Sequence, residues 1–304
     1  MNSDSLAEQG RAKAAVARLS VISNAALTAA KLVVGLAIGS IAVVAEALHS
    51  GVDLVAAALA LWSVRKASQP ADSTHPFGHG KFESLSAVIE AALIVVAAVG
   101  IIWVAVARLM SAASEVTLPV IGIIMMGISA AVNVVVSTLL FRVAHDTESP
   151  ALEADAWHLR TDVYTSVGVL IGMAGIHLTR LAGLPGGHLI DPIAAILVAL
   201  AIGHAAWDIT WRSVGQLTDH TLPADERRLI EQLIAEHYPQ FVDYHSLRSR
   251  RAGSERHVDL HLVVPPDTHV SDAHALADHL EEDIRRTLPN VHILIHVEPE
   301  GHQD

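Results

Sequence analysis

Six long apolar segments constrain the fold of this chain more than any other feature. A helix that crosses the hydrocarbon core of a bilayer needs about 20 mostly apolar residues. Six stretches meet this requirement, at residues 16–41, 43–64, 85–107, 116–141, 152–178 and 190–211. A soluble core helix can be equally apolar, but six in succession favour an α-helical polytopic membrane protein with six transmembrane helices. The first segment is too long for a cleaved signal peptide and continues directly into the second.

Lysine and arginine near the ends of these segments predict the orientation in the membrane. With the N-terminus inside, the cytoplasmic flanks hold Arg11, Lys13, Arg18, Arg65, Lys66, Lys81, Arg142 and Arg212, whereas the outer connections hold only Arg108 and Arg180. Both termini are therefore expected in the cytoplasm. Tight turns are expected at 39–40 and 183–187, where glycine is concentrated.

Residues 215–304 differ in composition from residues 1–214. They hold eleven of the nineteen histidines and carry 17 Asp+Glu against 8 Lys+Arg. Hydrophobic periodicity predicts helices at 222–239 and 271–288 and strands at 244–250, 256–264 and 291–297. The order α-β-β-α-β indicates a small, metallochaperone-like α+β domain with its helices on one sheet face. We therefore expect a transmembrane domain at 1–214 and a cytoplasmic metal-binding domain at 215–304.

Composition also excludes several classes of protein. The formal net charge of -12 argues against a nucleic-acid partner, which needs a basic surface. The absence of cysteine excludes disulfides and thiolate zinc sites. No His-Glu-x-x-His motif occurs, which argues against an intramembrane metalloprotease, and no enzyme activity is expected.

A pair of identical motifs inside the apolar segments carries the strongest functional signal. His49 and Asp53 lie four residues apart in the second segment, and His158 and Asp162 repeat this spacing in the fifth. Residues four apart share one face of a helix. Two facing helices would therefore supply two imidazole nitrogens and two carboxylate oxygens, a set that suits tetrahedral zinc. Either motif alone could be an interhelical hydrogen bond, but the pair indicates a metal site at mid-membrane depth.

Other polar residues in the segments have simpler explanations. Asn24, Lys31, Glu90 and Asn133 are expected to make hydrogen bonds within the helix bundle. Glu46 lies three residues before His49 on the same helix face. It could relay protons or gate the site, or it could lie at the outer end of its helix.

A second candidate metal site lies in the loop after the second segment. Asp72, His75 and His79 would have to converge through a loop, because Pro76 and the neighbouring glycines exclude a regular helix. A solvated loop is the alternative, and any metal site here is expected to be exposed and weak.

The cytoplasmic domain offers a third set of ligands from different elements. These residues are His245, His261, His274, His296 and Glu298. His296 and Glu298 share one face of the last strand, which favours metal binding over solvated histidines.

At these residues the sequence resembles the cation diffusion facilitator family of zinc-type efflux transporters over nearly its whole length. The resemblance is carried by AEALHSGVD at 45–53, HPFGHGKFE at 75–83, HLRTD at 158–162, DPIAA at 191–195 and IHVEP at 295–299. It implies that His49, Asp53, His158 and Asp162 form the transport site, and that Asp72, His75 and His79 form a loop site. It also implies a cytoplasmic binuclear site at a dimer interface, formed by His245, His261, His274, His296 and Glu298, and a charge pair, Lys81 with Asp219, between the two domains.

The chain departs from the family pattern at two positions. Some bacterial members carry Asp in place of His49, and histidine there is associated with zinc over cadmium. The last strand usually ends in His-Gln-Asp, whereas here it reads His296-Val297-Glu298. The longer Glu298 is expected to change affinity or the number of metals bound.

These features predict a homodimeric bacterial inner-membrane antiporter that exports Zn²⁺ in exchange for H⁺. Metal and protons compete for the same imidazole nitrogens, and rocking of the helices about the site would expose it to either side. The cytoplasmic domain would bind metal and bias transport. A membrane-anchored metal sensor without transport is the alternative. Fe²⁺, Co²⁺, Mn²⁺ and Cd²⁺ are alternative substrates, because site geometry discriminates weakly among similar ions.

Overall fold

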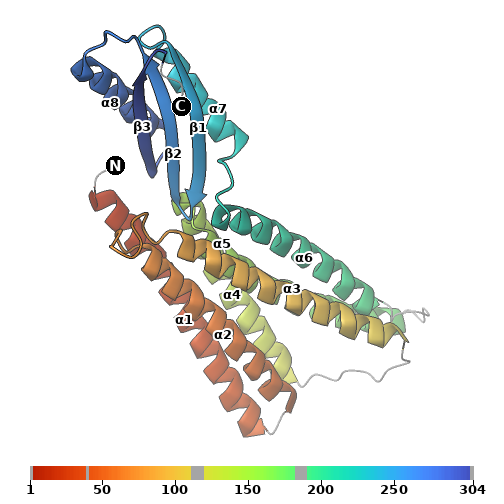
Figure 1. Ribbon diagram of the computed structural model, residues 1–304. Coiled ribbons are helices and arrows are strands. Elements are labelled where there is room, and N and C mark those ends of the chain that lie inside the picture. Colours follow the sequence, from red (N-terminus) through yellow and green to blue (C-terminus); the bar gives the residue numbers. More distant parts are fainter. Residues whose placement is uncertain (1–2, 39–40, 111–119, 182–189, 302–304) are drawn as a thin grey trace. The chain divides into compact units, whose positions relative to one another are not determined.

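The structure is a computed structural model that describes residues 3–38, 41–110, 120–181 and 190–301 (Figure 1). It divides into two compact units, which we describe separately. One unit is Gln9–Val214, and the other consists of Met1–Glu8 and Gly215–Asp304. The turns predicted at 39–40 and 183–187 lie outside the described residues.

Six long helices make up the first unit. They are α1 (Ser3–Ile38), α2 (Ile41–Ala67), α3 (Lys81–Met110), α4 (Val120–Thr147), α5 (Pro150–Leu181) and α6 (Ile190–Leu217). Each helix corresponds to one predicted apolar segment, and most extend beyond it. The extensions are polar: α2, for example, ends with Arg65 and Lys66, whose charges favour the C-terminal end of a helix.

Four of these helices are long and apolar enough to cross a membrane within the part of the chain that is described. The spans are Glu8–Ala37, Ala47–Ala67, Lys81–Ala107 and Ile123–Thr147, in α1 to α4. The two further spans expected in α5 and α6 stay a prediction. The side chains of residues 169–191, at the end of α5 and the start of α6, lie outside the description.

Helix α5 is central to the packing of this unit. One buried apolar cluster joins α1, α2, α4 and α5, and it includes Leu140, Leu152 and Leu159. A second cluster joins α3, α5 and α6 and is rich in alanine, including Ala91, Ala154 and Ala199. Small side chains allow helices to approach closely where there is no hydrophobic drive between them. Both clusters therefore fix α5, and with it the two ligands predicted on that helix.

A buried polar network links α1, α3 and the residue that precedes α5. The Lys13 Nζ donates to Glu83 Oε1 at 2.8 Å, and the hydroxyl of Ser149 donates to the other oxygen of Glu83. All three side chains are almost fully buried. Glu83 is therefore a buried carboxylate that is neutralised by a lysine from another helix, as buried charges usually are.

The second unit has the predicted order α-β-β-α-β. It contains α7 (Ala224–Glu236), β1 (Asp243–Ala252), β2 (Glu255–Val264), α8 (Val270–Thr287) and β3 (Val291–Pro299). The three strands form a mixed sheet in the order β1-β2-β3, antiparallel between β1 and β2 and parallel between β2 and β3. Both outer strands are longer than predicted, because polar residues continue the pairing beyond the apolar alternation.

One face of this sheet is apolar and is covered by both helices. Val258, Leu260 and Leu262 of β2 are buried with Ile234 of α7 and Leu280 of α8. The alternate residues of β2 and β3 point to the opposite face, where His257, His261, His292 and His296 are partly or fully exposed. The predicted alternation is confirmed, and it leaves a histidine-rich face outside the core.

Candidate metal sites

The first candidate site lies between α2 and α5, which each contribute one His–Asp motif. Donor atoms of His49, Asp53 and Asp162 all lie within 4.8 Å of one another. The Nε2 of His158 lies 3.1 Å from Asp53 Oδ1, so the fourth residue joins the group through that carboxylate. The four-residue spacing thus brings both motifs to one place. Two nitrogens and two oxygens are available there to a divalent cation.

Burial raises the free-energy cost of keeping charged side chains in this group. Asp53 and His158 are only 4% and 7% exposed. Asp53 is buried and Asp162 is half-buried, and carboxylates that lose contact with water need compensating cations or hydrogen bonds. Asn133 Nδ2 lies 3.5 Å from Asp162 Oδ2, at the limit for a hydrogen bond, and His158 contacts Asp53. A metal ion bound here would neutralise both carboxylates.

A cavity of about 450 Å³ opens onto three of these ligands, His49, Asp53 and Asp162. The polar residues around the rest of its wall come from α1, α2, α4 and α5, and they are Asn24, Lys31, Ser50, Ser129, Asn133, Thr161, Tyr164, Thr165 and Ser166. Sequence reasoning assigned Lys31 and Asn133 only to hydrogen bonding in the bundle. Helical periodicity could not show that they face the same cavity as the ligands, because it gives the face of one helix and not its neighbours.

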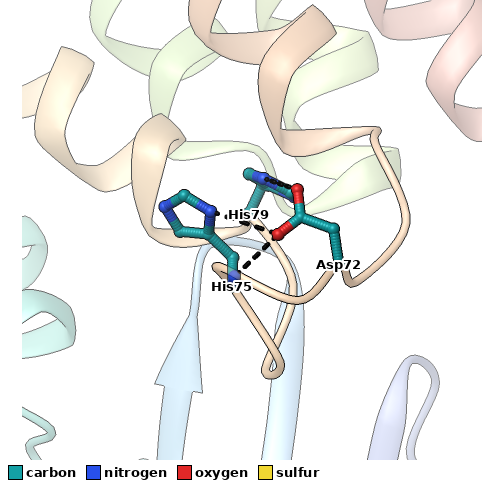
Figure 2. A group of neighbouring side chains, drawn as sticks. All are labelled: Asp72, His75 and His79. Carbon is teal, nitrogen blue, oxygen red and sulfur yellow. Dashed lines mark hydrogen bonds and ion pairs between the residues drawn. The ribbon is translucent and has the colours of Figure 1, made fainter.

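The loop after α2 brings Asp72, His75 and His79 together, as Figure 2 shows. The Asp72 carboxylate lies 3.5 Å from His75 Nδ1 through one oxygen and 3.3 Å from His79 Nε2 through the other. The two imidazole rings are 4.4 Å apart between centroids. The loop was expected to be exposed, and this is wrong for His79, which is buried at 2% exposure because it packs against Phe82 at the start of α3.

Hydrogen bonds fix the conformation of Asp72 in this loop. Its Oδ1 accepts hydrogen bonds from the Thr74 hydroxyl at 2.6 Å and from the backbone N–H groups of Thr74 and His75. The hydroxyl first, and then the two N–H groups, hold the pKa of Asp72 well below its usual range. The carboxylate is therefore ionised and preset for a cation.

The third group lies on the exposed sheet face of the second unit. The strand register makes His245, His261 and His296 neighbours in one row across β1, β2 and β3. Ring centroids are 5.0 Å apart both between His245 and His261 and between His261 and His296. Glu298 is buried beside this row, where it contacts His245 Nε2 and lies 3.7 Å from His261 Nδ1. Donor atoms of His245, His261 and Glu298 lie within 4.8 Å of one another.

Two further residues of the predicted cytoplasmic contacts are His274 and Asp219. His274 is 75% exposed on α8, where its Nε2 lies 3.5 Å from Asp278, and it does not join the group within this chain. Asp219 pairs with Arg250 at 3.0 Å in its own unit. The predicted pair of Lys81 with Asp219 would join the two units and stays a prediction.

Comparison with known proteins identifies the family of the chain. The model of the cation efflux transmembrane domain matches residues 17–218, and that of the cation efflux protein cytoplasmic domain matches residues 222–300. An uncharacterized transporter of Synechocystis is 34% identical, with 86% of this chain and 82% of that protein covered. The cation-efflux pump FieF of Escherichia coli is 30% identical, with 86% and 84% covered.

Some solved structures match a part of the chain. The Zn form of the protein CzrB, for example, is 38% identical over 28% of this chain and 98% of that chain, with a TM-score of 0.27. The two family models together cover most of the chain. The chain is therefore a membrane protein of the cation diffusion facilitator family, a cation efflux transporter with a helical transmembrane domain and a C-terminal cytoplasmic domain.

Proposed function

We propose that this transporter exports Zn²⁺ from the cytoplasm in exchange for protons. The observation that carries the proposal is the convergence of His49, Asp53 and Asp162, with His158 beside Asp53, in the helical unit. Two imidazoles and two carboxylates form a mixed nitrogen and oxygen set, which suits zinc better than ions that prefer oxygen alone. Histidine in place of Asp at position 49 favours zinc further.

Protons are the natural counter-ion for such a site. An imidazole nitrogen binds either a proton or a metal, so acidification on one side of the membrane expels the metal there. Transport then requires that the same site open alternately to each side, which helix rocking in transporters provides. His49 and His158 are the groups that would exchange zinc for protons.

The remaining parts of the chain fit a regulated dimer in the bacterial inner membrane. Residues 1–214 would form six spans with both termini in the cytoplasm, and residues 215–304 would form the regulatory domain. The group of His245, His261 and Glu298 would bind zinc at high cytoplasmic concentration, with His296 and a His274 from either copy as further ligands. The loop group of Asp72, His75 and His79 would bind zinc more weakly.

Isosteric substitution of the carboxylates tests the proposal. Asp53→Asn and Asp162→Asn keep the size of each side chain but remove the charge that holds a cation. We expect both variants to lose zinc flux into proteoliposomes while they remain folded in detergent. Asp146→Asn at the end of α4 is a matched control, because that exposed carboxylate lies 3.6 Å from the neighbouring His145 and is not part of the ligand group.

Near-normal flux in either variant would remove this group from the transport route. Zinc binding without any flux in the wild-type protein would instead favour a membrane-anchored sensor. Competition by Fe²⁺, Co²⁺, Mn²⁺ and Cd²⁺ in the same assay ranks the alternative substrates.

A further inference from the structure

Asn133 of α4 contacts a ligand of the candidate zinc site, although α4 supplies none of the four ligands. The side chain is 5% exposed and lines the same cavity as His49, Asp53 and Asp162. Its Nδ2 lies 3.5 Å from Asp162 Oδ2, at the limit for a hydrogen bond. A third helix thus contacts the carboxylate that α5 contributes to the site.

Packing between α4 and α5 fixes the place of Asn133. Val132 and Val136, on either side of it in the chain, pack in the buried cluster that α4 shares with α5. A hydrogen bond of 2.8 Å from Arg160 Nη2 to Thr138 Oγ1 joins the same two helices. The backbone of Asn133 is therefore held next to α5 by contacts other than its own.

The amide of Asn133 has one orientation that suits a carboxylate. An ionised carboxylate accepts hydrogen bonds and cannot donate them, so the amide nitrogen has to face Asp162. The amide oxygen, Oδ1, is then buried, and it has no hydrogen-bond partner among the residues that the structure describes. A buried polar atom without a partner costs free energy, which a leucine of similar size would avoid. Such a cost beside a metal ligand points to a role in the site.

The hydrogen bond bears on how many oxygens Asp162 gives to a metal ion. A carboxylate can bind a metal through one oxygen or through both, and zinc in proteins usually has four ligand atoms. Two histidines and two carboxylates complete that number only when each carboxylate uses one oxygen. Because Asn133 donates to Oδ2, Oδ1 is left to bind the ion, and the carboxylate is kept from turning both oxygens towards it.

We propose that Asn133 is a positioning residue that keeps Asp162 a one-oxygen ligand and thereby favours Zn²⁺ over ions that take more oxygen ligands. The proposal rests on the proposed function, since it concerns zinc transport through the same site. Mn²⁺ is the probe for the disfavoured ions, because it prefers oxygen ligands in octahedral geometry. Without the amide, Asp162 can bind through both oxygens, which raises the number of ligand atoms above four.

Zinc flux of the full-length protein in proteoliposomes, with Mn²⁺ as competitor, tests this role. The measured quantity is the Mn²⁺ concentration that halves flux at a fixed zinc concentration, divided by the Zn²⁺ concentration that gives half-maximal flux. Asn133→Leu keeps the size of the side chain but removes the donor. We expect the ratio to fall about tenfold, because loss of a hydrogen-bond partner of a metal ligand typically changes metal affinity by at least that factor.

Two further variants separate the amide from the packing of α4. Asn133→Gln keeps an amide donor on a longer side chain and should restore much of the ratio. Ser137→Ala is the matched control, because Ser137 lies one turn further along α4, is fully buried, and donates its hydroxyl to the Val134 carbonyl of the same helix. This control should leave the ratio unchanged.

Each outcome decides the matter. An unchanged ratio in folded Asn133→Leu would overturn the proposal, and so would an equal fall in Ser137→Ala or a fall that Asn133→Gln does not reverse. If Asn133→Leu does not fold, Asn133→Ala removes the same donor. Failure of both to fold would make Asn133 a structural requirement and overturn its role in selectivity. Absence of zinc flux in the wild-type protein would refute the proposed function instead.

Discussion

The row of histidines on the cytoplasmic sheet predicts that zinc stabilises this domain against unfolding. If His245, His261 and Glu298 bind zinc with His296 beside them, the isolated domain 215–304 should be stabilised by zinc. The domain has its own core, in which Leu280 and other residues of both helices pack on the sheet. It is therefore expected to fold without the membrane domain.

The size of the effect follows from linkage. A ligand that binds only the folded state stabilises it by about 2.7 kcal/mol at a hundredfold excess over Kd. In a domain of this size 1 kcal/mol shifts the melting temperature by about 4–8 °C, so zinc should raise it by about 10–20 °C. His261→Ala combined with His296→Ala should abolish the shift. The substitutions themselves should cost little stability, because neither residue is in the apolar core.

The same sheet face supplies a matched control. His257 and His292 lie four residues before His261 and His296 and stack on each other with centroids 5.1 Å apart, but the metal-ligand group does not include them. His257→Ala with His292→Ala removes two histidines from the same two strands and should leave the zinc shift intact. Thermal unfolding by circular dichroism with and without zinc measures all three proteins. An unshifted wild type, or equal losses in both double variants, would refute the assignment of the site to this row.

Two further predictions concern flux in the full-length protein. His49→Asp should retain transport but lower the preference for Zn²⁺ over Cd²⁺ or Mn²⁺, because a third carboxylate favours ions that prefer oxygen, and competition flux measures the ratio. His261→Ala with His296→Ala should lower zinc flux without eliminating it, since the membrane ligands remain; complete loss in a folded protein would place these histidines on the transport route.

The sequence predicts the ligands on each helix better than their surroundings. Helical spacing assigns His49 with Asp53 to one face and His158 with Asp162 to another, and the structure brings the two pairs together. The same spacing cannot show which residues of α1 or α4 border the cavity, since that depends on how the helices pack. Lys31 and Asn133 were therefore identified as polar residues of the bundle but not as part of the site's surroundings.

In the cytoplasmic domain the limit of prediction is strand register. Alternation along β2 places His257 and His261 on the exposed face, but it gives no means to decide which one faces His296. The pairing of β2 with β3 decides it, because His261 is the partner of His296 and His257 is the partner of His292. Glu298 then distinguishes the two rows, since it contacts His245 and approaches only the row that contains His261.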